Sequence, residues 1–296
     1  MKSFLTDKKI AVTNGKGFRL KKYDPAYKAD INKEAGLQQF EKIKQKLSVW
    51  QDKLYAQDKF SLLLVFQAMD AAGKDGTIKS VMTGVNPQGV DVVSFKKPSA
   101  EELDHDYLWR CYKSLPQRGR IGIFNRSYYE EVLVTRVHPE FIMGQHLPSI
   151  KSPKQIDQDF WENRFESIRN FEKHLSDNGT VILKFFLNVS KAEQKQRFLE
   201  RIAEPEKNWK FSYADLQERK HWDSYMQAYE EAIAATARPH APWFVIPSDS
   251  NWFRHLTVCS ILHETLKNMG LRYPAIDDET RLLLEKGRDE LMNESN

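Results

Sequence analysis

Apolar residues along this chain follow two patterns, unbroken runs and runs spaced by three or four positions. Nearly continuous apolar runs are typical of strands that are buried on both faces of a parallel sheet. They span 60–66, 90–95, 120–124, 180–187 and 243–246. Between them, helical spacing covers 37–55, 192–202 and 216–235. Strands that alternate with helices predict an α/β fold, in which a parallel central sheet is flanked by helices.

The N-terminal segment differs from the rest of the chain. Residues 1 to about 35 are polar and carry Gly15, Gly17 and Pro25, which predicts an extended arm rather than a folded unit. The remaining sequence has no internal repeat and no low-complexity tract. We therefore expect a single domain over 1–296 that carries helical insertions.

Composition restricts the class of protein further. Hydrophobic residues make up 41% and charged residues 29% of the chain, as in ordinary globular proteins. The formal net charge of +4 is too small to indicate nucleic-acid binding, so a polyanion would have to meet a local basic cluster. No apolar run approaches the ~20 residues of a membrane span, and the N-terminus lacks a signal-peptide core. We expect a cytoplasmic protein without nucleic-acid or membrane partners.

The segment after the first apolar strand carries the strongest chemical signal. It reads AMDAAGKDGT over 68–77 and leads from a strand into a helix. Gly73 and Gly76 allow the backbone to turn its amides inward, the helix start adds partial positive charge, and Lys74 can reach terminal phosphates. The pattern predicts a phosphate-binding loop. The alternative is a tight strand-to-helix turn with a solvated lysine.

Two positions of this loop depart from the common G-x-x-x-x-G-K-[ST] pattern. Ala68 occupies the first glycine position, and Asp75 replaces the Ser or Thr whose hydroxyl normally binds Mg²⁺. Asp75 offers a carboxylate to the metal instead, directly or through water, and Asp70 adds a second one. Two carboxylates beside a phosphate site require cations or arginines to neutralise them.

Arginine side chains follow the strand at 120–124. Ligands bind at the carboxyl ends of strands in open α/β sheets, so Asn125-Arg126 should face the phosphate loop. Arg126 can bind a phosphate through two hydrogen bonds, or form a surface ion pair with Glu130. Asn125 replaces the usual metal-binding aspartate of this strand, which leaves Glu130 as the nearest substitute. Arg136 follows within reach.

Two segments together resemble the polyphosphate kinase 2 family: AMDAAGKDG over 68–76 and FNRSYYEE over 124–131, followed by VLV. The resemblance covers roughly residues 18 to 272. It implies a thymidylate-kinase-like P-loop fold in which inorganic polyphosphate replaces ATP as phosphoryl donor. Asn125 and Tyr129-Glu130 resemble the members that accept nucleoside monophosphates, and the overall likeness implies the subgroup acting on mono- and diphosphates. It also implies a homo-oligomer, a dimer or a tetramer.

A basic helical segment at about 190–222 follows the fourth strand. Arg197 and Arg201 are four positions apart and share one helix face. By themselves they could be a solvated face paired with Glu193, Glu200 and Glu204. The family resemblance implies instead a lid that brings both arginines to the transferring phosphoryl group and excludes water.

These observations combine into one hypothesis: Mg²⁺-dependent, reversible transfer of the terminal phosphoryl group of polyphosphate to ADP, AMP or other nucleoside mono- and diphosphates, guanine nucleotides among the candidates. The product of ADP would be ATP. The expected residues are Asp70, Lys74 and Arg126 for catalysis; Ala72, Gly73, Lys74, Asp75, Gly76, Thr77, Arg126 and Arg136 for polyphosphate; Asp70, Asn125 and Glu130 for the nucleotide; Arg197 and Arg201 in the lid; and Asp70, Asp75 and Glu130 for the metal.

Two other functions are compatible with parts of the sequence. An ATP-dependent nucleoside monophosphate kinase would share the fold, but the missing first glycine and the missing Ser/Thr after Lys74 argue against it. A non-catalytic polyanion-binding protein would use the loop as an anion nest. Asp70, Asp75 and Glu130 argue against that function, because a pure anion trap should avoid carboxylates.

Overall fold

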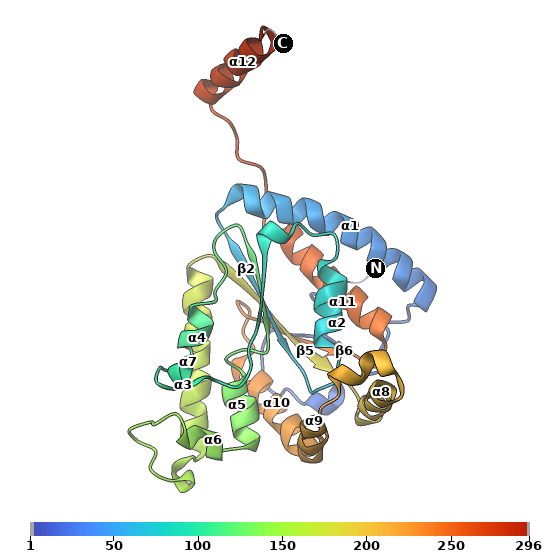
Figure 1. Ribbon diagram of the computed structural model, residues 1–296, viewed down its shortest axis with the longest axis vertical. Helices are drawn as coiled ribbons and strands as arrows, with labels where there is room; N and C mark the ends of the chain where they lie inside the picture. Colours follow the sequence, from blue (N-terminus) through green and yellow to red (C-terminus); the bar gives the residue numbers. More distant parts are fainter. Residues whose placement is uncertain (1–2, 295–296) are drawn as a thin grey trace.

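Six strands form one central sheet among the residues that the computed structural model describes, 3–294 (Figure 1). Their order is β1-β6-β5-β2-β4-β3, and all neighbours are parallel except β1 and β6. The strands are β1 (Ala11–Val12), β2 (Ser61–Gln67), β3 (Val90–Ser94), β4 (Ile121–Asn125), β5 (Thr180–Asn188) and β6 (Trp243–Pro247). Each of the five predicted strands is present within a residue or two of its expected bounds.

Helices flank the sheet on both faces. They are α1 (Lys33–Gln57), α2 (Lys74–Met82), α3 (Ala100–Leu103), α4 (Trp109–Tyr112), α5 (Glu130–Val137), α6 (Glu140–Met143), α7 (Gln158–Asp177), α8 (Lys191–Ala203), α9 (Tyr213–Glu218), α10 (Trp222–Thr236), α11 (Asn251–Asn268) and α12 (Asp278–Met292). Helices α1, α2 and α11 pack together on one face, and α5, α7 and α10 pack together on the other (Figure 1). The predicted α/β class with a parallel central sheet is confirmed.

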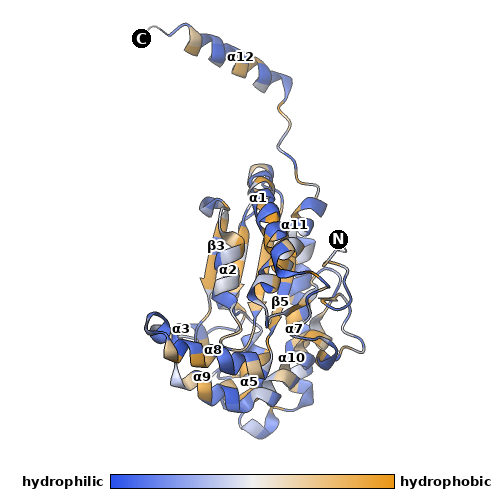
Figure 2. Ribbon diagram, turned by 90° about the vertical axis from the view of Figure 1, so that its right-hand side faces the viewer, coloured by the Kyte–Doolittle hydropathy of each residue, from blue (hydrophilic) through white to orange (hydrophobic). Residues whose placement is uncertain are grey.

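The core follows from the apolar runs. All seven residues of β2 are buried, and the strands form an apolar interior while the helices turn polar faces outward (Figure 2). Burial of continuous apolar strands between two helical layers removes their surface from water and is the main stabilising term. The loops at the carboxyl ends of β2, β4, β5 and β6 gather at one edge of this rigid sheet.

The N-terminal residues lie against the sheet. β1 extends the sheet at the β6 edge, and the side chains of Phe4, Ile10 and Phe18 are buried in the core. The segment expected to be an extended arm therefore contributes core side chains. A single edge strand without helical neighbours gave little periodic signal in the sequence.

The C-terminal helix α12 lies apart from the body (Figure 1). Its leucines Leu282, Leu283, Leu284 and Leu291 are 57–72% exposed. The connecting segment is held at Tyr273, whose hydroxyl donates to Asp52 of α1. Within residues 3–294, no helix combines the length and the apolar composition needed to cross a bilayer.

Candidate active site

The loop between β2 and α2 adopts the strained shape expected of a phosphate-binding loop. Ala71 and Gly73 both have left-handed φ angles, of 61° and 100°. Gly73 precedes the first residue of α2, Lys74. A Cβ atom at Gly73 would lie 2.6 Å from the Nη2 atom of Arg254, so both the backbone angle and the close approach require glycine. Strain of this kind gathers at ligand sites.

The first turn of α2 carries the remaining predicted loop ligands. Asp75 and Gly76 are exposed, whereas Ala72 and Thr77 are buried. The Thr77 hydroxyl donates to the Gly73 carbonyl oxygen at 2.8 Å. Because the first amides of a helix have no intrahelical acceptor, this turn presents N–H donors together with the positive end of the helix dipole.

Lys74 lies partly buried at the mouth of the loop. Its Nζ atom donates to the carbonyl oxygen of Ala68 at 3.0 Å. Burial lowers the pKa of Lys74, and the neighbouring Asp70 carboxylate opposes that shift. A cation that is poorly hydrated and close to free helix amides is well suited to an anionic ligand.

Arg126 and Asp70 meet where β4 ends beside β2. The Arg126 Nη2 atom donates to Asp70 Oδ1 at 3.0 Å, and its Nη1 atom lies 3.7 Å from Glu130 Oε2. Arg126 has a left-handed φ of 64°, and its backbone amide donates to the Phe66 carbonyl of β2. The structure therefore brings the phosphate loop and the β4 end into one site, and the ion pair with Glu130 exists alongside it.

Burial and charge act in opposite directions on this cluster. Burial raises the pKa of the Glu130 carboxyl, while Arg126 and Lys74 oppose the rise. Burial would lower the pKa of Arg126, but Glu130 and Asp70 outweigh it and raise the pKa. Each charge in the cluster is thus stabilised by opposite charges around it.

The three carboxylates expected to bind a metal do not form one preassembled ligand set. Asp70 and Glu130 are paired with Arg126, and Asp75 accepts a hydrogen bond from the Asn125 amide at 2.7 Å. Among the described residues, no group of three or more acidic, His or Cys side chains is arranged to hold a metal ion. The arginine and the asparagine amide separate the carboxylates, which sequence spacing alone could not reveal.

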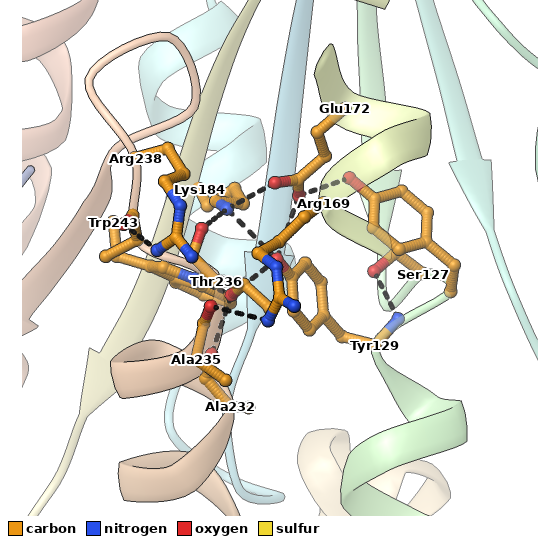
Figure 3. Close-up of polar contacts among 12 residues, drawn as sticks. Ser127, Tyr129, Arg169, Glu172, Lys184, Ala232, Ala235, Thr236, Arg238 and Trp243 are labelled. Carbon is orange, nitrogen blue, oxygen red and sulfur yellow. Dashed lines mark hydrogen bonds and ion pairs between the residues drawn. The ribbon is translucent and has the colours of Figure 1, made fainter. Parts of the chain in front are cut away.

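The two tyrosines of the FNRSYYEE segment face away from the loop and anchor it. Tyr128 and Tyr129 are buried, and both hydroxyls donate to Glu172 of α7, at 2.9 and 2.8 Å. Lys184 of β5 donates to Glu172, to the Tyr129 hydroxyl and to the Thr236 carbonyl (Figure 3). This network fixes the start of α5, and so the backbone that carries Arg126 and Glu130.

Arg136 is directed elsewhere. Its guanidinium is paired with Glu231 of α10 at 2.9 Å and lies 4.8 Å from the ring centroid of Trp161. These contacts place it in a packing interface between α5, α7 and α10. The expected contact of Arg136 with polyphosphate stays a prediction, and its guanidinium would have to leave Glu231 to make it.

The expected lid comprises α8, α9 and the short turns around them. A helix predicted over 216–235 is interrupted, because a 3-10 turn at Arg219–His221 separates α9 from α10. Arg197 of α8 donates to the carbonyl oxygens of Ala71, Ala72 and Ser248, and it is paired with Glu193. Arg197 therefore supports the phosphate loop from behind, contrary to the expectation that it points at the phosphoryl group.

Arg201 lies one turn farther along α8, on the side that approaches α9. Its Nη1 atom is 3.9 Å from Asp215 Oδ2 of α9. Burial raises the pKa of Asp215, and the nearby Asp70 raises it further, while Arg201, Arg126 and Lys74 lower it. The Asp215 carboxylate is thus close enough to interact with the charges of the site, and no motif in the sequence pointed to it.

Sequence reasoning also missed two side chains that hold the loop. Arg254 of α11 is buried and donates to the Thr77 hydroxyl at 2.7 Å, and the Gln194 amide of α8 donates to the Asp70 carbonyl at 2.8 Å. A signal for Arg254 was present: the predicted strand at 243–246 is followed by Pro-Ser-Asp-Ser, and ligand-facing loops follow strand ends.

A phosphate loop after the first strand of a parallel sheet, with a helical segment across it, defines a P-loop kinase fold. The family described as Polyphosphate kinase 2 (PPK2) matches residues 30–274, and the chain belongs to that family. The resemblance seen in the two motifs is thus confirmed. Helix α12 lies outside the matched range.

Individual relatives agree with this family. An ADP-polyphosphate phosphotransferase of Rhodopseudomonas palustris is 50% identical over 248 residues, which cover 84% of this chain and 85% of the relative. An AMP/ADP-polyphosphate phosphotransferase of Meiothermus ruber is 45% identical over 269 residues, with 90% and 95% covered. The crystal structure of Polyphosphate Kinase 2 from Arthrobacter aurescens TC1 matches with a TM-score of 0.85 and 37% identity. The match covers 96% of this chain and 97% of the chain in that structure.

Proposed function

We propose that this protein is a polyphosphate-dependent nucleotide kinase that transfers the terminal phosphoryl group of inorganic polyphosphate, reversibly, to ADP, AMP or related nucleotides. The observation that carries the proposal is the convergence of Lys74, Arg126 and Asp70 at the free N-terminus of α2. The printed names of the two curated relatives support the donor and the acceptors. Guanine nucleotides remain candidate acceptors.

Phosphoryl transfer requires positioning and charge neutralisation more than covalent help from the protein. In our proposal the loop amides from Gly73 to Thr77 and Lys74 bind the end of the polyphosphate chain. Arg126 swings from Asp70 and Glu130 onto the transferring group, since phosphate competes with carboxylate for a planar guanidinium. Asp70, thereby released, orients the acceptor oxygen. Asn125 and Glu130 complete the nucleotide side of the site.

Mg²⁺ fits this donor set, provided that phosphate oxygens supply part of its coordination. The ion usually takes one or two carboxylates together with phosphate oxygens and water. Asp75 is exposed at the helix start, and Asp70 lies at the other side of the loop, so these two would hold the ion, with Glu130 as a third contributor. When bound, Mg²⁺ would neutralise charge on the phosphates.

The lid contributes one arginine to the substrate side in this proposal. Arg201 and Asp215 face each other near the site, so Arg201 is placed to move to a phosphate when the lid closes. Arg197 keeps its place behind the loop. Arg136, paired with Glu231, acts through the position of α5.

An assay of donors separates the proposal from its two rivals. The full chain is incubated with Mg²⁺ and either AMP or ADP, with polyphosphate or ATP as donor, and the nucleotides are resolved chromatographically. We expect ADP and ATP to form from polyphosphate. Turnover with ATP alone would indicate the nucleoside monophosphate kinase. Polyphosphate binding without nucleotide turnover would indicate the polyanion-binding protein.

We further propose a cytoplasmic homo-oligomer, dimer or tetramer, in which α12 packs on a second copy of this chain. Its four leucines are exposed, because the helix lies apart from its own body (Figure 2). Residues 277–294 carry seven acidic and three basic residues, whereas the whole chain has a net charge of +4. The C-terminal helix is therefore acidic and the rest of the chain is basic, so the two attract each other between copies. Light scattering of the full chain and of Leu284→Lys/Leu291→Lys tests this proposal: equal masses for the two proteins would contradict it.

A further inference from the structure

Arg254 lies directly beneath the phosphate loop and is 3% exposed. Its Nε atom donates to the Thr77 hydroxyl at 2.7 Å, and its Nη1 atom donates to the Ser248 carbonyl at 3.1 Å. Its Nη2 atom fills the space that a side chain at Gly73 would need. The guanidinium therefore contacts the loop at two residues and the β6 end at a third.

These contacts continue into the backbone of the loop. The Thr77 hydroxyl in turn donates a hydrogen bond to the Gly73 carbonyl, so Arg254 orients that carbonyl through Thr77. Arg197 holds the Ala72 carbonyl from the same side. The Ala72 carbonyl and the Gly73 N–H belong to the same trans peptide group, in which C=O and N–H point in opposite directions. The Gly73 amide is therefore directed away from the arginines. Both arginines thus help to aim loop amides at an anion.

The charge of Arg254 has no ion-pair partner in the described part of the chain. Among residues 3–294, no carboxylate lies within 4 Å of its guanidinium nitrogens, whereas Arg197 has Glu193 at 2.9 Å. Burial lowers the pKa of Arg254 to about 9, and the charge of Arg197 lowers it as well, while Glu193 opposes the shift. The other buried arginines are paired: Arg164 with Glu131 at 3.4 Å and Arg110 with Glu102 at 3.5 Å.

A buried charge without a partner destabilises a fold unless something else compensates it. We propose that Arg254 is a positioning residue for polyphosphate: it holds the loop in its phosphate-binding shape, and the bound phosphate chain balances its charge. Arg254 does not touch the substrate, because Gly73 and Thr77 lie between them. The identity of the anion rests on the proposed function, but binding to the loop can be measured without any nucleotide.

The test measures thermal unfolding of the full chain with increasing polyphosphate and no nucleotide. Arg254→Met removes the charge, and Arg254→Lys keeps the charge but lacks the planar guanidinium. Arg164→Met removes a buried arginine that has an ion-pair partner, and it serves as the matched control. In Arg254→Met, the Ser248 carbonyl still accepts a hydrogen bond from Arg197, and the Thr77 hydroxyl still donates to the Gly73 carbonyl. The unliganded melting temperature should therefore change little. The polyphosphate concentration that gives half of the stabilisation should rise about tenfold or more.

The control should behave in the opposite way. Arg164→Met leaves the Glu131 carboxylate without a counter-charge, so the unliganded melting temperature should fall while the half-stabilising concentration stays at the wild-type value. Arg254→Lys should lie between wild type and Arg254→Met in polyphosphate binding, and it decides the question if Arg254→Met fails to fold. In turnover assays, Arg254→Met should raise KM for polyphosphate and leave KM for the nucleotide unchanged.

Two results would overturn the proposal. One is an unchanged half-stabilising concentration in Arg254→Met or, if that variant does not fold, in Arg254→Lys, since Arg254 would then be structural only. The other is a wild-type protein that polyphosphate does not stabilise. A wild-type protein that is stabilised by polyphosphate but transfers nothing to nucleotides would refute the proposed function and leave the role of Arg254 intact.

Discussion

Two buried cations lie near the candidate site, and their surroundings differ in one respect. Lys184 is fully buried, and its three hydrogens go to Glu172 at 2.7 Å, to the Tyr129 hydroxyl at 3.0 Å and to the Thr236 carbonyl at 3.0 Å (Figure 3). Arg254 also makes hydrogen bonds, but none of the described carboxylates pairs with it. We interpret charge balance within the protein as the mark of a structural role. In our proposal, the unpaired charge beneath the loop has a role that a ligand completes.

The FNRSYYEE segment connects the two regions. Tyr128 and Tyr129 point to the balanced network, while Arg126 and Glu130 point to the loop where charge is open to a ligand. One short stretch of sequence thus has a structural side and, in our proposal, a ligand-binding side. Substitutions on the two sides should separate a loss of activity from a loss of stability.

The largest effect is expected on the ligand-binding side. Lys74→Ala or Arg126→Ala should reduce phosphoryl transfer from polyphosphate on the order of 10³-fold, because each removes a cation that the proposed function places at the transferring phosphates. The far-ultraviolet circular dichroism and the melting temperature should stay near the wild-type values, since both side chains are partly exposed. Steady-state rates with AMP and ADP check this prediction.

The control for these variants is Lys173→Ala, which removes an exposed lysine that is paired with Asp177 on α7. It should keep wild-type turnover. A folded Lys74→Ala protein with undiminished turnover would exclude the loop as the site of transfer.

The next effect is expected in the balanced network, and it concerns stability. Lys184→Met leaves the Glu172 carboxylate buried without a counter-charge, which should lower the free energy of unfolding by about 3–5 kcal/mol. Lys184→Met combined with Glu172→Gln removes both charges and should recover part of that loss. Urea unfolding measures both variants.

Two observations would contradict the interpretation of this network. If Lys184→Met alone unfolds at the wild-type urea concentration, the ion pair carries no stability. If the double variant is as unstable as the single one, the loss comes from packing rather than from the unpaired carboxylate.

The strands and the phosphate loop were predictable because their signals are local. Continuous apolar runs identified each long strand, and a Gly-Lys pair between a strand and a helix identified the loop. Lys184 also left a local trace, as a single charge inside the apolar run at 180–187. Its partners Glu172 and Tyr129 lie on other elements, so only the packed sheet could pair them.

The directions of long side chains were not predictable. Arg197 and Arg136 carry four or five rotatable bonds each, and tertiary packing sends one to the loop carbonyls and the other to Glu231. For Arg254, the only sequence signal was its place shortly after the end of a predicted strand. Its importance follows from where α11 crosses behind the loop, a consequence of the strand order.

The smallest effect is a pH dependence that distinguishes Lys184 from its surroundings. Burial lowers the pKa of Lys184 to about 8, against the opposing attraction of Glu172 and with a further lowering by Arg238. The unfolded chain keeps the ordinary value of 10.5 and therefore binds more protons between these limits. The free energy of unfolding should accordingly rise with pH over this window, by at most about 1.4 kcal/mol per pH unit.

Lys184→Met with Glu172→Gln lacks this titration, so its stability should rise less than that of the wild type between about pH 7 and about pH 9.5. Urea midpoints at the two pH values measure the difference, and subtracting the variant cancels the other lysines and tyrosines common to both chains. Equal slopes would mean that Lys184 keeps an ordinary pKa in the folded state. Glu172 and the two oxygens beside it would then offset the burial completely, and the balance of charge in this network would be stronger than its distances suggest.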